Sequence, residues 1–553
     1  MFTNTLKTIG LTCAAILLAS AGFKAAAQTP SVTWQKALGG SGDDVMTDMQ
    51  VTADKGLIIA GYSKSNVSGS KSNASFNNTY DFWVIKMDSL GNKQWDRTYG
   101  GTDVDQAAAV IQTKDLGFLI GGSTISAISG NKTDSVHFQS YDYWLIKLDK
   151  AGNLKWQKTV GAAYTDKLSC LGEASTRYLA GGSSFSNKDG DKKTPNAGSE
   201  HGPDFWVAQL NKKTGRATSS QSYGSTNDDS MTGMLVSPND QRTFIGFSYS
   251  PAKGTKKSKL IGVCDYWLVR TDAGGRQIWE KAYGGANADY LNCLAQVPGD
   301  GSYLLGGSSS SDAFADKTQN SFGFSDYWVV KTDSLGNKQW DKTIGGDMGD
   351  YMQSVAATAD GGFLLGGYSN SHVGNSKSEA PLGGYDYWIV KVDAHGNKQW
   401  DKTYGGSGND KLVAVKQLSA TDYMLGGTSN SSASGNKSVG SFGGNDIWLL
   451  RISSRGSQRI AQQPEVPVAL ASLSMNVVPN PVKSNMTVSY SSQSNTKLSL
   501  KVIGEDGKVM FSTTLASAEQ GSYTANVSAL RAGVYYVVLQ SGSSIVTKRI
   551  IKE

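Results

Sequence analysis

A three-residue motif, Asp-(aromatic or Ile)-Trp, recurs seven times along this chain at intervals of 60 to 62 residues. The copies start at Asp81, Asp142, Asp204, Asp265, Asp326, Asp386 and Asp446. The remaining six of the 13 Trp residues occupy a second fixed position of the repeat, and Thr218 stands there in the one copy without a Trp. Ten residues beyond that position stands an Asp, namely Asp44, Asp105, Asp166, Asp228, Asp289, Asp350 and Asp410. A long period with several fixed positions indicates one supersecondary unit per copy.

Each unit contains four short segments with the character of strands. In the copy from Asp326 to Ser371, a near-continuous apolar run (YWVVKTD) is typical of a strand covered on both faces. A turn leads to KQWDKTI, a Gly-rich loop leads to the small-residue segment YMQSVAATA, and a second tight turn leads to FLLGGYS. Four strands per unit at a fixed period predict the blade of a β-propeller.

The two ends of the array each supply half of one unit. Residues 31–40 contain only the strand of the second Trp, and residues 446–452 contain only the strand of the first Trp. We therefore predict an all-β fold, a seven-bladed β-propeller over residues 31–453 in which the N-terminal strand closes the last blade. Within a blade, the small-residue strand is expected nearest the axis and the second-Trp strand outermost. Closure would remove the open sheet edges that promote aggregation.

The units resemble the SBBP-type bacterial β-propeller repeats through the recurring run GG…D…(D/N)G…G. This resemblance covers residues 31–453. It implies a propeller architecture and carries little information about activity.

Residues 473–553 differ in composition from the array and show six alternating segments typical of a small, immunoglobulin-like β-sandwich. They resemble the type A C-terminal sorting domain of type IX secretion cargo, which implies handling by the type IX secretion machinery and a sorting peptidase. The residues that carry the match are Pro479, Asn480, Pro481, Gly504, Gly507, Leu530, Gly533, Tyr535 and the basic finish from Lys548 to Lys552. The segment 454–472 between array and tail is predicted to be a linker.

Residues 1–27 are predicted to be a cleaved secretory signal. Lys7 precedes a short apolar core, and Ala25-Ala26-Ala27 fits the small-residue cleavage rule. No apolar run approaches the length of a membrane-spanning helix. We therefore expect a chain secreted through the periplasm, either extracellular or attached to the outer-membrane surface. Three Cys remain after cleavage, and a Cys264–Cys293 bridge is one option beside three buried thiols.

Charge and composition exclude several classes of function. The chain carries +6 overall, but the signal, linker and tail hold the excess, which leaves residues 28–453 near −1. A nucleic-acid partner is therefore not expected, because such proteins need a concentrated basic patch. Only 4 His are present, and no metal-binding or catalytic motif surrounds them. We expect no cofactor and no enzymatic activity.

The fixed Asp and Trp residues are predicted to be architectural, with the Asp accepting backbone N–H bonds and the Trp filling space between blades. Parity of the connections places the long polar loops and the Gly-Gly loops on one face and the tight turns on the other. Each long loop holds a Lys, and we predict a ring of ligand-binding ammonium groups there. Its members are Lys71, Lys132, Lys193, Lys257, Lys317, Lys377 and Lys437, with Lys192 and Lys256 added in the two most divergent loops. The alternative is a set of solvated lysines without a ligand.

We expect a secreted or cell-surface binding or adhesion module that recognises a glycan or a protein through the long-loop face. The alternative is an extracellular propeller-fold glycosidase or polysaccharide lyase. Paired carboxylates in the central channel would favour that alternative.

Overall fold

The computed structural model describes residues 29–197, 202–454, 474–491, 498–504, 508–515, 520–541 and 544–553. The chain divides into two compact units, residues 1–456 and 457–553, and each is described by itself. The described residues form 35 strands and no helix. The predicted signal segment 1–27 and nearly all of the predicted linker 454–472 lie outside the described residues.

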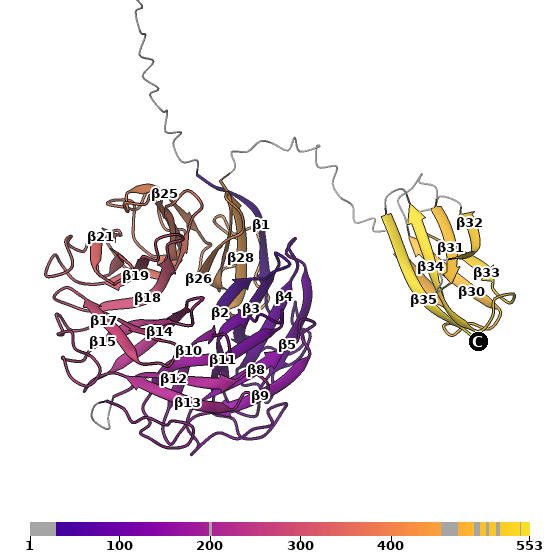
Figure 1. The fold of residues 1–553 in the computed structure, drawn as a ribbon. Helices are drawn as coiled ribbons and strands as arrows, with labels where there is room; N and C mark the ends of the chain where they lie inside the picture. The colour runs from indigo at the N-terminus through magenta and orange to yellow at the C-terminus, as the bar shows by residue number, and fades with distance from the viewer. Residues whose placement is uncertain are drawn as a thin grey trace, which may run out of the picture. The chain divides into compact units, whose positions relative to one another are not determined.

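The first unit contains seven four-stranded antiparallel sheets, numbered here along the chain (Figure 1). Sheet 1 holds β2 (Asp44–Val51), β3 (Leu57–Ser63), β4 (Asp81–Met87) and β5 (Lys93–Tyr99). Sheet 2 holds β6 (Asp105–Gln112), β7 (Phe118–Thr124), β8 (Asp142–Leu148) and β9 (Leu154–Val160). Sheet 3 holds β10 (Asp166–Glu173), β11 (Arg177–Ser184), β12 (Asp204–Asn211) and β13 (Ala217–Tyr223).

The remaining sheets repeat this order. Sheet 4 holds β14 (Asp229–Val236), β15 (Arg242–Ser248), β16 (Asp265–Thr271) and β17 (Gln277–Tyr283). Sheet 5 holds β18 (Asp289–Gln296), β19 (Tyr303–Ser309), β20 (Asp326–Thr332) and β21 (Lys338–Ile344). Sheet 6 holds β22 (Asp350–Ala357), β23 (Phe363–Ser369), β24 (Asp386–Val392) and β25 (Lys398–Tyr404). Sheet 7 holds β26 (Asp410–Gln417), β27 (Asp422–Ser429), β28 (Asp446–Ser453) and β1 (Ser31–Leu38).

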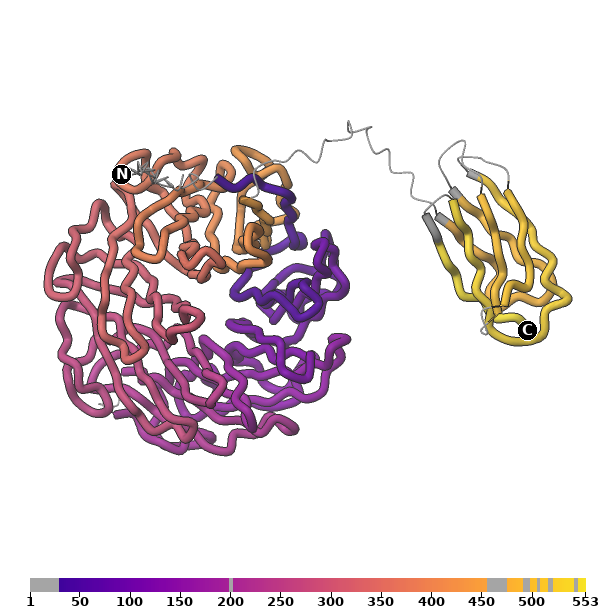
Figure 2. Tube along the Cα trace, turned by 45° about the horizontal axis from the view of Figure 1, so that its top comes forward, coloured from indigo at the N-terminus to yellow at the C-terminus, as the bar shows by residue number. Residues whose placement is uncertain are grey.

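The seven sheets follow one another around a common centre, as in a β-propeller (Figure 2). The strand order within each sheet is the predicted one, with the small-residue strand at one edge and the second-Trp strand at the other. A central cavity of about 510 Å³ is lined from the first strand of every sheet, by residues such as Thr47, Ala108, Asn292 and Ser354. The small-residue strands therefore lie innermost. Their short side chains suit the crowded centre, while bulky strands such as β20 and β24 are buried along their whole length.

The N-terminal strand β1 pairs with β28 in antiparallel register, from Ser31 opposite Ser453 to Leu38 opposite Ile447. This is the pairing expected from the two half-units at the ends of the array. The first and last sheets also share one hydrophobic cluster, in which Met46 and Trp83 pack with Met424 and Leu449. The two ends of the array therefore contact each other.

Tryptophans fill the space between sheets, as predicted. The seven Trp of the Asp-(aromatic or Ile)-Trp motif are fully buried. In sheet 3, Trp206 packs against Tyr143 of sheet 2 with ring centroids 4.7 Å apart, and the Tyr143 hydroxyl donates to the Trp206 carbonyl. The second Trp position faces a turn glycine of the following sheet, so that a Cβ on Gly152 would lie 2.8 Å from Trp95. Ser219, and not Thr218, occupies the position that lacks Trp, because Ser219 pairs with Gln209 where Trp279 pairs with Arg270.

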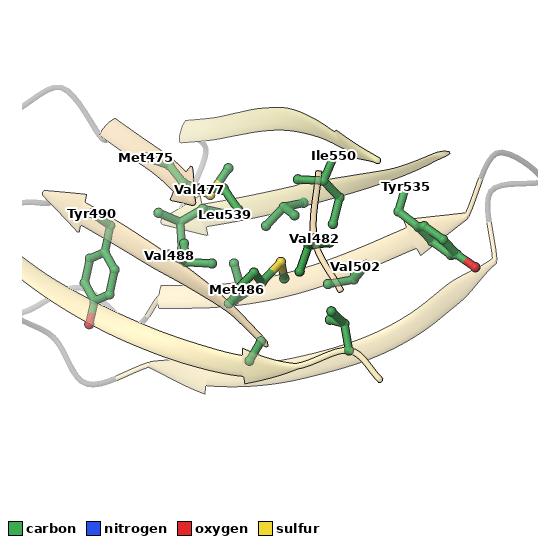
Figure 3. Close-up of a cluster of buried hydrophobic side chains, with 14 of the residues drawn as sticks. Met475, Val477, Val482, Met486, Val488, Tyr490, Val502, Tyr535, Leu539 and Ile550 are labelled. Carbon is green, nitrogen blue, oxygen red and sulfur yellow. The ribbon is translucent and has the colours of Figure 1, made fainter. Parts of the chain in front are cut away.

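The second unit consists of two sheets around one hydrophobic cluster (Figure 3). One sheet holds β29 (Ser474–Val478), β30 (Asn485–Ser491) and β33 (Gln520–Asn526). The other holds β32 (Val509–Leu515), β31 (Leu498–Gly504), β34 (Gly533–Ser541) and β35 (Ser544–Lys552). Met486, Val488, Val502 and Leu539 lie between them and are fully buried.

The residues that resemble a sorting signal meet at one edge of this unit. Asn480, between Pro479 and Pro481, accepts a bond from the Ile551 N–H (2.9 Å) and donates to the Arg549 carbonyl (3.1 Å). The Tyr535 hydroxyl donates to the Arg531 carbonyl (3.0 Å), and Gly533 begins β34 beside Lys552. Lys552 is buried, whereas Lys548 is exposed on the same strand. The Pro-Asn-Pro segment and the basic finish therefore form one continuous edge.

Candidate ligand-binding site at the mouth of the central channel

The long loops fold back over their sheets, and each buries the Lys that recurs in every repeat. Each loop closes a tight turn on a Lys, as in the bridge between Ser68 and Lys71, and the side chain then points into the sheet. The buried lysines are Lys71, Lys132, Lys192, Lys256, Lys317, Lys377 and Lys437, none more than 3% exposed. The prediction of an exposed ring is therefore wrong for Lys71, Lys132, Lys192, Lys256, Lys317, Lys377 and Lys437. In the two divergent loops, the equivalent residues are Lys192 and Lys256, while Lys193 and Lys257 are exposed beside them.

The buried ammonium groups are held by hydroxyl and carbonyl oxygens and by aromatic faces. Lys377 Nζ donates to Thr403 Oγ1 at 2.7 Å and lies 5.3 Å from the centroid of the Trp388 ring. Lys317 Nζ donates to the Ser311 and Gln319 carbonyls at 2.7 and 2.9 Å. Five of the seven lysines lie over the first Trp of their own sheet in this way. A long aliphatic stem buried with a satisfied ammonium is a structural arrangement, not a free binding surface.

Two buried carboxylates flank each lysine, one from the first strand and one from the third strand of its sheet. Burial lowers the pKa of Lys71, Lys132 and Lys192 to about 8, and the neighbouring Asp charges oppose that shift. Burial raises the pKa of Asp81 to about 8 and the pKa of Asp204 to about 7. Desolvation is the largest cause of these pKa shifts, because it disfavours the charged form of both the Lys and the Asp side chains.

The fixed Asp residues accept backbone N–H bonds where loops meet strands, as predicted. Gly346 N donates to Asp350 Oδ2 at 2.8 Å, and Phe322 N donates to Asp326 Oδ2 at 2.6 Å. In sheet 4 this role belongs to Asp229, not to Asp228, because the turn before β13 is one residue longer than its equivalents. The other oxygen of Asp326 packs on Gly345, where a Cβ would lie 1.7 Å away. This contact explains why a Gly follows the outer strand in every sheet.

The exposed lysines of the divergent loops are bound within their own turns. Lys193 Nζ donates to the Gly190 carbonyl, and Lys257 Nζ donates to the Gly254 carbonyl, both at 2.6 Å. Residues 198–201 of the first divergent loop lie outside the described residues. The three thiols are free, so the optional Cys264–Cys293 bridge is not formed.

The central cavity contains little titratable chemistry. Among the described residues that line it, Asp48 is the one carboxylate and Lys416 the one ammonium. Asp48 accepts N–H bonds from Met49 (2.7 Å) and from Val110 of the next sheet (3.0 Å). Its oxygens are therefore engaged in joining two sheets.

The mouth of this cavity on the long-loop face is built from three equivalent positions in each sheet. They are the second residue of the first strand, the next-to-last residue of the second strand, and the residue before the third strand. The first two face each other in the ladder, as Tyr351 faces Tyr368. In sheets 1 to 3, such residues, including Tyr62, Gln106, Tyr141 and Lys167, line a cavity of about 450 Å³.

Aromatic and lysine side chains collect at these positions. In sheet 6, Tyr351, Tyr368 and Tyr385 contact one another with ring centroids 5.3 to 5.9 Å apart. Lys411 Nζ of sheet 7 lies 5.5 Å from the centroids of both Tyr368 and Tyr385.

Similar groups occur elsewhere around the mouth. Lys167 Nζ lies 5.4 Å from the Tyr141 ring. Phe247 contacts Tyr290 edge to face at 5.0 Å, and the Tyr290 and Tyr249 hydroxyls are 3.0 Å apart. These side chains are partly or fully exposed, unlike the fixed positions of the repeat.

Reasoning from the sequence missed this site because it followed the positions that stay constant. The residue after the repeated Asp is instead highly variable: Val45, Gln106, Lys167, Ser230, Tyr290, Tyr351 and Lys411. Variation beside an invariant structural residue, enriched in Tyr and Lys, is the signal that could have identified the mouth.

Comparison with known proteins identifies the tail. Residues 476–553 match the family model for the secretion system C-terminal sorting domain. Regulatory protein FlaEY of Caulobacter vibrioides is 27% identical over 184 residues, which span 32% of this chain and 19% of that protein.

Two solved structures illustrate the structural likeness. A protein of unknown function from Dyadobacter fermentans has a TM-score of 0.40 and 10% identity, covering 77% of this chain and 99% of its own. A quinohemoprotein alcohol dehydrogenase from Pseudomonas putida has a TM-score of 0.35 and 11% identity, covering 77% and 76%. Likeness at this level gives no guide to activity. The SBBP resemblance of the array stays a prediction.

The sorting domain places the protein at the cell surface or in the extracellular space, as a client of the type IX secretion system. Within the described part of the chain, no helix is long and apolar enough to cross a membrane.

Proposed function

We propose that this secreted chain is a non-enzymatic binding module, a closed seven-bladed β-propeller that recognises an extracellular glycan or protein at the mouth of its central channel. The sorting tail delivers it through the type IX machinery, and a sorting peptidase removes the tail. The observation that carries the proposal is the collection of exposed aromatic and lysine side chains at three variable positions of a rigid frame. Binding residues on a rigid scaffold are typically found at such loop-facing ends.

The closed ring is supported by the β1–β28 pairing and by the hydrophobic cluster that the first and last sheets share. The Thr428 hydroxyl of sheet 7 also accepts a bond from Met46 N of sheet 1 at 3.1 Å. The same bond joins Ser308 of sheet 5 to Met352 of sheet 6 at 3.2 Å. The junction between the chain ends thus resembles an internal junction.

A glycosidase or lyase is the alternative function. Glycoside hydrolysis typically uses two carboxyl groups about 5 to 9.5 Å apart on either side of the bond that is cleaved. Of the described residues lining the central cavity, Asp48 is the one carboxylate, and its two oxygens accept backbone N–H bonds. This favours binding over hydrolysis.

The test is a binding screen of the full secreted chain against panels of polysaccharides and cell-surface proteins. A mouth variant carries Tyr62→Ser, Phe247→Ser and Tyr368→Ser, each of which introduces the residue that sheets 2, 3 and 5 have at that position. A turn-face variant carries Leu90→Ser and Leu335→Ser, which replace exposed residues on the opposite face. We expect the mouth variant to lose binding and the turn-face variant to retain it. The reverse pattern, or release of shorter sugars from a bound polysaccharide, would contradict the proposal.

A further inference from the structure

The next-to-last residue of the second strand has a structural role in four of the seven sheets. There it is Ser or Thr, and its hydroxyl accepts a backbone N–H from the first strand of the next sheet. The bonds join Ser123 to Leu168 N, Ser183 to Met231 N, Ser308 to Met352 N and Thr428 to Met46 N, at 3.0 to 3.2 Å. In the other three sheets the residue is Tyr62, Phe247 or Tyr368, whose side chains have no hydroxyl on Cβ. These three sheets lack this hydrogen bond to the next sheet and have an aromatic ring at the mouth instead.

In sheet 6 this ring belongs to a group of three, Tyr351, Tyr368 and Tyr385, which we call the tyrosine triad. The rings of Tyr351 and Tyr368 are inclined by 31°, and the ring of Tyr385 stands at 70° and 81° to them. All three side chains are half-buried, so part of each residue is accessible from solvent. Such a surface is apolar on its faces and hydrogen-bonding at its edges. The C–H face of a pyranose and its equatorial hydroxyls have the matching pattern.

The cations beside the aromatic groups indicate the charge of the ligand. Lys64, near Tyr80, is neutralised by Asp43 at 2.5 Å. Lys411 at the triad and Lys167 at Tyr141 are exposed, and neither forms an ion pair with a carboxylate in the described part of the chain. An exposed ammonium beside a stacking surface suits a sugar that carries a carboxylate.

The available space agrees with an oligosaccharide. A cavity of about 450 Å³ that Tyr62, Gln106 and Lys167 line, in another sector of the mouth than the triad, falls within the range of roughly 300 to 1,000 Å³ typical of small-ligand sites. It opens inside the ring of sheets, whereas a protein partner would need roughly 800 Å² of accessible contact surface. Resting on the proposed function, we infer that the mouth binds an acidic oligosaccharide. One uronate ring stacks on the tyrosine triad, and its carboxylate is paired by Lys411.

The experiment is calorimetric titration of the full secreted chain with oligosaccharides of galacturonate, mannuronate and hyaluronate. The methyl ester of the best ligand serves as the neutral probe. The variant Tyr368→Ser adopts the residue of sheets 2, 3 and 5, and Lys411→Gln adopts the residue of sheet 2, so both are expected to fold. Tyr164→Ser and Lys257→Gln are controls, because both residues are exposed on the same face outside the triad. Melting curves verify that each variant is folded.

We expect at least one acidic oligosaccharide to bind, with affinity that falls as salt rises. Tyr368→Ser, Lys411→Gln and methyl esterification should each weaken binding at least tenfold, while the controls leave it unchanged. Equal binding of the ester, or full binding by both triad variants, would overturn the inference. Failure of all three acidic probes would also overturn it. If poly-glutamate or a protein then bound at the mouth, the proposed function would stand without this ligand class.

Discussion

Single residues in this molecule illustrate how burial decides the role of a charge. Lys192 and Lys193 are adjacent in sequence, yet Lys192 is fully buried and Lys193 is exposed. Lys192 Nζ donates to Ser184 Oγ at 2.9 Å and to Asn196 Oδ1 at 2.6 Å, with Asp166 and Asp204 close enough to raise its pKa against the effect of burial. A buried charge of this kind is costly to leave without its partner.

The neighbouring pair allows a matched prediction. Lys192→Ala leaves the buried carboxylates of Asp166 and Asp204 without an ammonium, and should lower the free energy of unfolding by about 3–5 kcal/mol. Lys193→Ala removes an exposed group and should change it by less than about 0.5 kcal/mol. Denaturant titration at pH 8 measures both. At pH 5 the loss should shrink, because burial raises the pKa of Asp166 and of Asp204 to about 7 and both can then take up protons. Equal losses from the two variants would contradict the assignment.

The same residues show where reasoning from sequence succeeds and where it stops. Asp350 and Asp326 could be assigned as backbone acceptors because their spacing fixes them at loop-to-strand junctions. The lysines could not be placed, because a Lys in a polar loop has the same pattern whether the loop stands in solvent or folds back. The spacing also predicts the wrong residues after β12, since one extra turn residue moves the equivalent positions to Ser219 in sheet 3 and Asp229 in sheet 4. The tyrosine triad escaped notice because its residues differ from sheet to sheet.

Among the strands, β1 is the one whose contribution to stability can be measured most directly by deletion. It lies at the outer edge of sheet 7 and pairs along β28, and Leu38 joins the cluster shared by sheets 1 and 7. Without it, β28 would present its backbone N–H and C=O groups as an unprotected sheet edge.

Deleting residues 29–38 should therefore lower the melting temperature by several degrees and promote association. Differential scanning fluorimetry and size-exclusion chromatography measure the two effects. Thr33→Ala is the control. It removes one exposed bond, from Thr33 Oγ1 to the Arg451 carbonyl, and leaves the strand in place. A monomeric deletion variant with an unchanged melting curve would show that β1 is dispensable.

For the molecule as a whole, the buried Asp residues make the free energy of unfolding depend on pH. Burial raises the pKa of Asp81 to about 8, of Asp166 and Asp204 to about 7, and of Asp229, Asp289, Asp326 and Asp386 to about 6. Between about pH 4 and pH 8 the folded chain thus holds protons that the unfolded chain releases. The free energy of unfolding must then fall as pH rises through this window. The lowered pKa of Lys71 has the opposite sign, but it acts only above about pH 8.

The melting temperature should accordingly be several degrees higher at pH 5.5 than at pH 8 at constant ionic strength. Carboxyl groups with lowered pKa, such as Asp43 at about 2 beside Lys64, act below this window and do not offset the trend. Asp81→Asn, which carries no titratable proton, should flatten the dependence relative to the unaltered chain. A melting temperature that rises from pH 5.5 to pH 8 would be incompatible with these shifts.

The partnership of β1 with β28 also sets the order of events in folding. Thr33 and Arg451 are hydrogen-bonded across 418 positions of sequence, so the fourth strand of sheet 7 cannot be added before nearly the whole array is available. Contacts of such high order are slow to form, because chain entropy must be lost before any of them stabilises the fold. Six sheets can assemble from neighbouring segments alone, while the seventh waits for its first strand. Until β1 has paired, the backbone N–H and C=O groups along the outer edge of β28 are open to pairing with another chain.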